Sequence, residues 1–502
     1  MGETPQRVTR GQWMALTAAL LGWLFDGLEM GLFPLVAGPA LDDLLPEGHA
    51  PGDVGFWFNI ATAAFLVGAA TGGVLFGWIG DRIGRVRAMT LSVVTYALFS
   101  GLCGLATGPI QITVLRFVAA LGMGGEWSLG VALVMEIWPD KSRAFLAGLI
   151  GAAANVGYLL IAVIGLGLGA LLVEIEWFLR AIQLPDAWVT ALVAHGGWRI
   201  LMLMGALPAL LTFFIRLFVP ESERWQEEKE KGSTSHWATQ DLLGVLVGAG
   251  GGLAMIVLWA HPDLPLAVRI LGSIPAVIVA TLGYLYPVSR YMKRAGAGSE
   301  TAAADWARTR HRLLLGAALG GVALLGTWAS IQQAPTWANA AFGQLVPQAR
   351  SYTQIASSAG AIIGTIVAAM LGGWLGRRVT YFGLCIASLA SALMLYQLTT
   401  GFNAGFVIAA FLAGATTASF YGWLPLYLPE LFPTKVRATG QGFSFNFGRI
   451  IAAIGALQGG YLIREVFKGD FATVCSIMSL VYIVGMVIIW FAPETKGQPL
   501  PD

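Results

Sequence analysis

The chain has 502 residues, of which 56% are hydrophobic and 12% are charged, and its formal net charge is +2. Soluble globular domains carry about 25% charged residues, so this composition excludes an ordinary soluble protein and favours a chain that lipid solvates. No basic run suggests a nucleic-acid partner. The cysteines Cys103, Cys385 and Cys475 lie in apolar runs and predict buried thiols rather than disulfides.

Apolar runs that are long enough to span a bilayer recur along the whole chain. A spanning helix needs roughly 20 mostly apolar residues. The runs cover residues 13–41, 54–79, 88–107, 109–137, 144–173 and 197–219, then 241–260 and 264–287, and finally 312–336, 352–375, 378–398, 402–428, 440–465 and 470–492. We therefore predict an all-α integral membrane protein with about fourteen transmembrane helices. The first run has no cleavage site after it, so we expect a retained helix rather than a signal peptide.

Basic residues are concentrated in alternate loops, which predicts the orientation of the chain. Lysine and arginine in short loops mark the cytoplasmic side. Such residues follow the second run at Arg82 and Arg85, whereas the loop at 41–53 is acidic. We expect both termini in the cytoplasm and the protein in the inner membrane. The runs at 241–260 and 264–287 lie between two cytoplasmic segments, so they should form a transmembrane hairpin; a pair of interfacial helices is the alternative.

Two short patterns occur twice. The pattern E-x-x-P-x-x-x-R from Glu136 to Arg143 returns from Glu430 to Arg437, at an offset of 294. The segment Trp78–Arg82 resembles Trp374–Arg378, at an offset of 296. Parallel halves with a site between them are a known plan of transporters. We therefore predict an N-terminal half at 1–220, a central segment with the hairpin at 221–311, and a C-terminal half at 312–502.

These motifs resemble the major facilitator superfamily, and the resemblance covers essentially the whole chain. The segment GWIGDRIGRVRA at 77–88 is similar to the superfamily's signature loop between its second and third helices. Arg116 with the glycines that follow it resembles the fourth-helix pattern, while Pro220-Glu221-Ser222 and Pro493-Glu494-Thr495 are similar to the sugar-porter branch. In the second copy of the signature loop, Arg377 stands where an aspartate is expected.

The resemblance implies a major facilitator fold of two six-helix halves, here with an inserted hairpin. It also implies a transporter and not an enzyme, with no catalytic residues, no metal and no cofactor besides a proton gradient. A nucleotide-driven pump is excluded independently, because the chain has no G-x-x-x-x-G-K-[ST] motif.

Charged residues at the cytoplasmic helix ends are expected to close that side. Asp81 and Arg85 are four residues apart and share one helical face. Ion pairs among such residues can latch the two halves together; the alternative is that the arginines only set the topology. The predicted gate consists of Asp81, Arg82, Arg85, Glu136, Arg143, Glu430 and Arg437.

Four charged residues inside the apolar runs predict proton coupling, because ionisable residues within a span are energetically costly and usually functional. Asp26 and Glu29 are three residues apart and face one side. Two neighbouring carboxylates in an apolar site do not both ionise easily, so one of them should exchange a proton. Arg116 is expected to pair with one of them, and Glu126 to line the same cavity at another depth. The alternative for each is a static ion pair that fixes helix packing.

Arg449 is the strongest sequence indication of the solute. It lies about nine residues into its run, near the membrane middle, and its counterpart at the 294 offset is the neutral Asn155. A guanidinium in a central cavity offers a planar fork to a carboxylate. An ion pair with Asp26, Glu29 or Glu126 is the alternative.

The neighbouring segments resemble particular branches of the superfamily. Those at 25–29 and 447–450 resemble motifs of aromatic-acid:proton symporters, and Gly124-Gly125-Glu126 with the hairpin resembles sialic-acid transporters. Gln332-Gln333 resembles the glutamine pair of sugar porters. The resemblance implies proton-coupled uptake of a small organic acid (aromatic, sialic or sugar acid) by a monomer in the bilayer; a proton-coupled symporter of a neutral monosaccharide is the alternative. The predicted substrate-binding residues are Arg449, Gln332, Gln333, Asn155, Trp337 and Tyr421.

Overall fold

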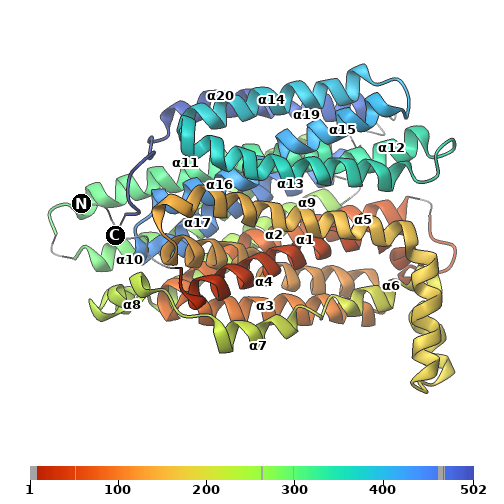
Figure 1. Ribbon diagram of the computed structural model, residues 1–502, viewed down its shortest axis with the longest axis horizontal. Coiled ribbons are helices and arrows are strands. Elements are labelled where there is room, and N and C mark those ends of the chain that lie inside the picture. Colours follow the sequence, from red (N-terminus) through yellow and green to blue (C-terminus); the bar gives the residue numbers. More distant parts are fainter. Residues whose placement is uncertain are drawn as a thin grey trace.

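The computed structural model describes residues 8–50, 52–261, 264–297, 299–461, 467 and 470–501. This part of the chain is built from helices and contains no β-strand. Thirteen of its helices are long and apolar enough to cross a membrane. They run side by side along one direction of the molecule, as Figure 1 shows. The prediction of an all-α integral membrane protein is thereby confirmed.

The two ends of the described chain lie at the same end of the helical bundle. Gln12 donates from Nε2 to the carbonyl oxygen of Ile137, at 2.9 Å. Near the other end of the chain, Pro501 accepts from Arg437, which also donates to Glu136. We call this side of the bundle the terminal end, and the other side the far end.

The N-terminal half consists of seven helices, coloured red to yellow-green in Figure 1. They are α1 (Arg10–Leu44), α2 (Asp53–Ile83), α3 (Arg85–Leu102), α4 (Pro109–Ile137), α5 (Arg143–Ala181), α6 (Asp186–Met204) and α7 (Ala209–Phe218). The predicted sixth run, 197–219, is divided between α6 and α7. Helix α5 continues beyond its predicted end at 173, and its last turns project sideways from the bundle at the far end (Figure 1).

Glycines allow α1 and α5 to touch backbone to backbone, as is usual for packed transmembrane helices. A carbon atom added at Gly27 would lie 1.9 Å from the carbonyl oxygen of Ala154, and one added at Gly157 would lie 2.2 Å from that of Leu24. Only glycine fits at either position. This contact brings the acidic segment of α1 against the middle of α5, where Asn155 lies.

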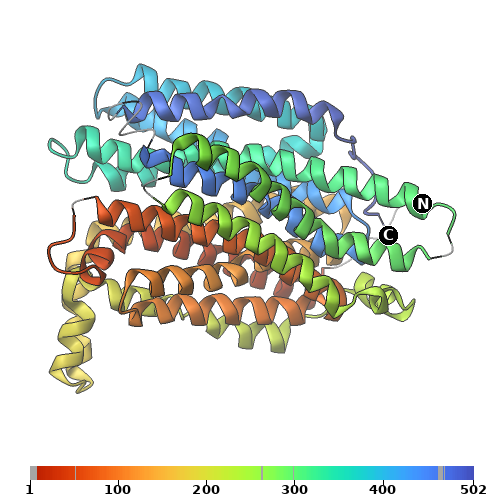
Figure 2. The ribbon, with the colours of Figure 1, turned by 180° about the vertical axis from the view of Figure 1, so that it is seen from behind.

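The central segment begins with the short helix α8 (Glu223–Glu230) and continues as a hairpin of α9 (Leu242–Ala260) and α10 (Leu266–Ala295). Both hairpin helices are long and apolar enough to cross a membrane, and they run along the outside of the bundle (Figure 2). Helix α9 packs on α2 of one half and on α18 of the other. The Tyr284 hydroxyl and the Thr71 hydroxyl of α2 are hydrogen-bonded at 2.8 Å. These features favour the transmembrane hairpin over interfacial helices.

The C-terminal half is built on the same plan. It consists of α11 (Ala302–Ala329), α12 (Ala334–Phe342), α13 (Ala349–Leu375), α14 (Arg377–Leu398), α15 (Ala404–Thr417), α16 (Phe420–Leu431), α17 (Arg437–Asn446), α18 (Gly448–Tyr461), α19 (Phe471–Ser479) and α20 (Val481–Ile488). The predicted run at 440–465 is the pair α17 and α18, which is broken at Phe447 and is not among the thirteen long helices. With this pair the bundle matches the fourteen predicted spans, although residues 462–465 lie outside the described chain.

Replacement of Tyr284 by phenylalanine tests the attachment of the hairpin. Tyr284→Phe removes one buried hydrogen bond, which is expected to lower the free energy of unfolding by about 1 kcal/mol. The midpoint of thermal unfolding of the detergent-purified protein should fall measurably. Tyr286→Phe is the matched control, because the Tyr286 side chain is exposed. Equal midpoints for the two variants would contradict an anchoring role for the Tyr284 hydroxyl.

Candidate functional site

A buried network of charges joins the two halves at the terminal end. Arg85 donates to Asp81 (Nη1 to Oδ1, 2.7 Å) and to Glu136 (Nη2 to Oε1, 3.1 Å). From the other half, Arg437 donates to the same Glu136 oxygen at 2.8 Å. Asp81 also accepts from the backbone N–H and the hydroxyl of Thr439, at 2.9 and 2.6 Å. All four charged side chains are buried, so the network closes this end of the bundle. We call it the terminal latch.

The two halves support their arginines with the same local device. A glycine with positive φ, 112° at Gly84 and 98° at Gly376, precedes Arg85 and Arg377 and allows a sharp turn into the next helix. The backbone N–H of Arg85 then donates to Glu221 at 2.9 Å, and that of Arg377 donates to Glu494 at 3.0 Å. The similar tripeptides Pro220-Glu221-Ser222 and Pro493-Glu494-Thr495 therefore cap equivalent helices in the two halves.

This equivalence corrects the predicted register of the second signature loop. Arg85 and Arg377 each donate from Nη1 to the carbonyl of the glycine five residues earlier, at 2.8 and 2.9 Å. Arg377 is thus the counterpart of Arg85, at an offset of 292, and does not replace the aspartate. Gly373 occupies the position of Asp81. The C-terminal half therefore lacks a counterpart of the Asp81 carboxylate, as predicted, but the residue in its place is Gly373 and not Arg377.

Three of the predicted gate residues lie outside the terminal latch. Arg82 donates to the Thr239 hydroxyl at the start of the hairpin, at 3.0 Å. Arg143 pairs with Asp140 of its own half. Glu430 is held within the C-terminal half by an arginine, at 2.5 Å, and by a threonine hydroxyl. The repeat offers two ion pairs between the halves, Glu136 with Arg437 and Glu430 with Arg143. The structure forms the first of these, in the terminal latch.

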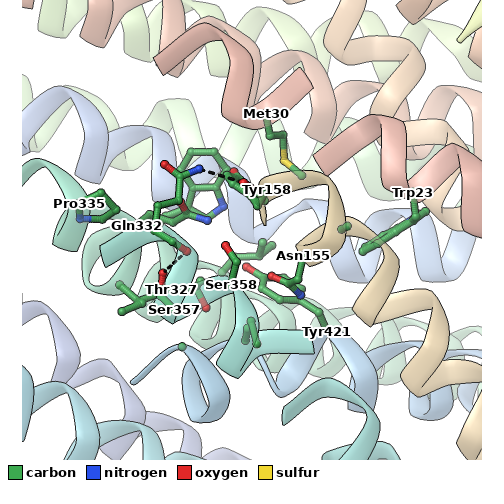
Figure 3. A pocket seen from close by; sticks show the side chains of 18 of the residues that line it. Trp23, Met30, Asn155, Tyr158, Thr327, Gln332, Pro335, Ser357, Ser358 and Tyr421 are labelled. Atoms are coloured by element: carbon green, nitrogen blue, oxygen red, sulfur yellow. Dashed lines mark hydrogen bonds between the residues drawn. The ribbon is translucent and has the colours of Figure 1, made fainter. Parts of the chain in front are cut away.

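Two cavities lie between the halves, beyond the terminal latch. The inner cavity is lined by residues from helices of both halves, and Figure 3 shows their side chains facing one space. From the N-terminal half come Trp23, Met30, Asn155 and Tyr158; from the C-terminal half come Thr327, Trp328, Gln332, Gln354, Ser357, Ser358, Tyr421, Phe445 and Arg449. The outer cavity, of about 350 Å³, lies nearer the far end and shares Tyr158, Gln332 and Gln354 with the inner one. Its volume suits a small solute.

Arg449 lines the inner cavity, and no acid among the described residues forms an ion pair with it. Its side chain is 5% exposed, and its Nε and Nη1 atoms are buried without a hydrogen-bond partner. The ring of Phe445 lies 5.6 Å from the guanidinium carbon. No ion pair to Arg449 occurs within the described residues. The structure therefore disfavours the ion-pair alternative. A buried guanidinium without a partner is strongly disfavoured, so an anion that enters this cavity gains by binding to it.

Five of the six predicted substrate-binding residues line these cavities. Arg449, Asn155 and Tyr421 line the inner cavity, Gln333 the outer one, and Gln332 both. Trp337 lines neither, which corrects its prediction. Its ring packs in an apolar cluster with the rings of Phe342, Tyr396 and Phe406, at centroid distances of 5.9, 4.9 and 5.7 Å.

Tyr158 and Gln354 line both cavities and were not predicted from the sequence. Tyr158 follows Asn155 by three residues, and this spacing places both on one face of α5. That signal was available, whereas nothing in the sequence around Gln354 marks it as a cavity residue.

Arg116 and Glu29 form one of two groups of predicted coupling residues. Arg116 donates from Nη1 to Glu29 Oε1 at 3.0 Å, as expected for one of the two carboxylates of α1. The Ser100 hydroxyl donates to the same oxygen at 3.3 Å, and the Phe33 ring lies 3.8 Å from the guanidinium carbon. This buried pair is electrically neutral.

Asp26 and Glu126 form the second group, which differs from the predicted pairing of Asp26 with Glu29. The Glu126 carboxylate lies against α1 at Gly22, one turn before Asp26; a carbon atom added at Gly22 would lie 1.6 Å from Oε1. Both Glu126 oxygens and Oδ1 of Asp26 are buried without a hydrogen-bond partner. An uncompensated carboxylate is expensive to bury, whereas a neutral carboxyl group is tolerated. These two acids are therefore the better place to hold a proton, although neither lines a cavity.

Two similar helical halves, latched at one end and with cavities between them, define the architecture of a membrane transporter. The family described as "Sugar (and other) transporter" matches residues 45–247 and 270–502. The chain belongs to this family, within the major facilitator superfamily, and is a multi-pass transporter rather than an enzyme.

Proteins that the chain resembles over nearly its full length include transporters of organic acids. It is 25% identical to the cis,cis-muconate transport protein of Acinetobacter baylyi, over 97% of this chain and 95% of that one. It is also 25% identical to the niacin transporter NiaP of the same organism, over 96% and 93%. Among solved structures, the proton:xylose symporter XylE of E. coli has a TM-score of 0.65 at 17% identity, with 98% of both chains covered, which shows the fold.

Substitution of Glu136 tests the terminal latch. Glu136→Gln removes the acid that Arg85 and Arg437 share, and breaking a buried ion pair costs about 3–5 kcal/mol. The terminal end should therefore open more often. The test uses Asn155→Cys, in a background whose native cysteines are alanine, with a membrane-impermeant maleimide on the side that carries the termini. Labelling should accelerate at least about tenfold, or ~1.4 kcal/mol.

The exposed Glu227→Gln is the control for this experiment and should leave the labelling rate unchanged. The terminal latch is contradicted if Glu136→Gln labels no faster than the parent protein.

Proposed function

We propose that the protein is a secondary transporter that takes up a small organic acid with protons by alternating access. The charge of the cavities carries this proposal. Arg116, Arg350 and Arg449 line them, and no aspartate or glutamate is among the described lining residues. Glu29 neutralises Arg116. The remaining positive charge favours an anionic solute.

The inner cavity offers more than a charge. Five aromatic side chains stand around it and present flat apolar surfaces: Trp23, Tyr158, Trp328, Tyr421 and Phe445. Such surfaces suit the planar carbon skeleton of an unsaturated or aromatic acid. The two similar Acinetobacter baylyi proteins are a muconate and a niacin transporter, which supports the same class of solute.

A neutral monosaccharide is the second candidate solute. Amides and hydroxyls around the inner cavity, from Asn155, Gln332, Gln354, Ser357 and Ser358, are able to bind sugar hydroxyls. This polar set does not neutralise Arg449, however. A sugar acid uses both features, with the carboxylate on the guanidinium and the hydroxyls on the amides.

Coupling to protons is supported by Asp26, which lies within electrostatic range of Arg449 although the two side chains form no ion pair. Asp26 belongs to the N-terminal half and Arg449 to the C-terminal half, and the Glu126 carboxyl group lies one turn from Asp26, against Gly22. An ionised Asp26 competes with a substrate carboxylate for the guanidinium, whereas a protonated Asp26 releases it. Loading of a proton at Asp26 or Glu126 therefore prepares Arg449 to bind the acid.

We place the terminal end on the cytoplasmic side of the inner membrane, because arginine and lysine are concentrated in the loops of that end. With the terminal latch closed, solute enters the cavities from the far end. Rocking of the halves then breaks the latch and releases proton and acid inside. The proton gradient is the driving force, and transport needs no other cofactor and no partner besides lipid.

Uptake by proteoliposomes tests the class of solute. With an inward proton gradient, the wild-type protein should accumulate cis,cis-muconate, nicotinate or N-acetylneuraminate, and not xylose. Arg449→Gln should lower the affinity for the acid at least about tenfold, because a charge-assisted hydrogen bond contributes about 1.5–3 kcal/mol. Arg87→Gln, at an exposed arginine, is the control. Accumulation of xylose without any of the acids would establish the sugar alternative instead.

A double substitution tests the coupling residues. Asp26→Asn with Glu126→Gln leaves no titratable group at the proposed proton site. It should abolish accumulation driven by the pH gradient and spare the exchange of labelled for unlabelled acid in preloaded vesicles. The exposed pair Glu227→Gln with Glu230→Gln is the control. Persistent gradient-driven accumulation in the first variant would refute this assignment, and Glu29→Gln would then test the other carboxylate.

A further inference from the structure

Arg350 is a second cavity arginine without an acidic partner. It stands at the start of α13, is half-buried and lines the outer cavity. No carboxylate within the described chain pairs with it. Arg116 lines the same cavity, but its charge is neutralised by Glu29. The uncompensated charge of the outer cavity therefore belongs to Arg350.

The guanidinium of Arg350 also connects the two halves at the far end. Its Nη2 donates to the carbonyl oxygen of Pro34 in α1, at 2.9 Å. One turn further along α13, Gln354 donates from Nε2 to the carbonyl of Tyr158 in α5, at 3.3 Å. These two contacts between α13 and the N-terminal half have neutral acceptors, unlike those of the terminal latch. An arginine has five N–H donors, and the bond to Pro34 occupies one of them.

Polar groups that are able to bind a carboxylic acid line the outer cavity together with Arg350. They are the side chains of Asn59, Thr62, Gln333, Thr336, Ser351 and Gln354. The residues shared with the inner cavity, among them Gln332, place the two cavities next to each other. An anion bound at Arg350 thus lies in the cavity next to the one that Arg449 lines.

We propose that Arg350 is an outer capture site for the carboxylate of the incoming acid, and that capture loosens the far end of the bundle. A carboxylate is a stronger acceptor for a guanidinium than a neutral carbonyl is. Binding of the acid therefore withdraws Arg350 from Pro34 and weakens a contact between the halves. This inference rests on the proposed function, since it requires an anionic solute.

Initial rates of uptake test the capture site, with whichever of cis,cis-muconate, nicotinate or N-acetylneuraminate the wild-type protein accumulates. Arg350→Gln should raise KM about tenfold at low ionic strength and leave kcat within about twofold. Capture by an unpaired charge depends on salt, so the wild-type KM should rise with ionic strength and that of Arg350→Gln should not. Arg350→Lys should recover part of the affinity, and Arg290→Gln, at an exposed arginine, should behave as wild type.

The outcomes separate this proposal from the proposed function. If the wild-type protein accumulates none of the three acids, the proposed function fails and the capture site with it. If it accumulates an acid and Arg350→Gln has the wild-type KM and salt dependence, the capture site alone is overturned. A loss of kcat at unchanged KM also overturns it, because Arg350 would then act only as a contact between the halves.

Discussion

The cost of burying charge governs this structure. A charge inside a helical bundle in lipid needs a partner, because neither water nor lipid neutralises it. At the terminal end this demand is met, since Asp81, Arg85, Glu136 and Arg437 neutralise one another across the halves. Further along the bundle, no acid among the described residues forms an ion pair with Arg449, and Oδ1 of Asp26 and both oxygens of Glu126 are buried without a hydrogen-bond partner. A proton is able to neutralise these carboxylates, and an anion is able to neutralise the arginine. The charges of the terminal latch are thus neutralised within the protein, whereas those of the candidate site need a proton and a solute.

The internal repeat explains where the two halves agree and where they differ. Both halves use a glycine turn, an arginine and a capping glutamate at the same place. The N-terminal half adds Asp81, which holds backbone and hydroxyl groups of the other half, whereas Gly373 has no side chain to do so. The terminal latch is therefore asymmetric. One half supplies most of the acceptors, and the other supplies Arg437 and the N–H groups near Thr439.

Much of this fold was predictable from the sequence, because each transmembrane helix must present about 20 apolar residues to lipid. The breaks within apolar runs were not predictable. Phe447, which divides α17 from α18, lies in a run whose hydropathy continues across it. The register of the second loop was misjudged for a related reason: a short tryptophan–glycine pattern recurs four residues away from the true correspondence at Arg377.

The site was predictable in part. A lone arginine in an apolar run identified Arg449, because burying it has no structural benefit. The partner of Asp26 was not predictable, since spacing along α1 says which residues share a face but not which helix that face meets. Glu126 of α4 meets it, and Glu29 turns to Arg116 instead. Trp337 illustrates the opposite error, a large aromatic residue whose role is packing. Arg350 was missed because it begins a helix, where arginine usually serves only as an anchor.

We propose above that binding of a proton at Asp26 or Glu126 and binding of a carboxylate at Arg449 occur together. Isothermal titration calorimetry of the purified wild-type protein with cis,cis-muconate or nicotinate tests it most directly, in two buffers of equal, near-neutral pH and different ionisation enthalpy. The observed binding enthalpy should depend on the buffer in the sense of proton uptake, because the acid binds when Asp26 or Glu126 is protonated. Tight binding of the acid with the same enthalpy in both buffers would contradict the account.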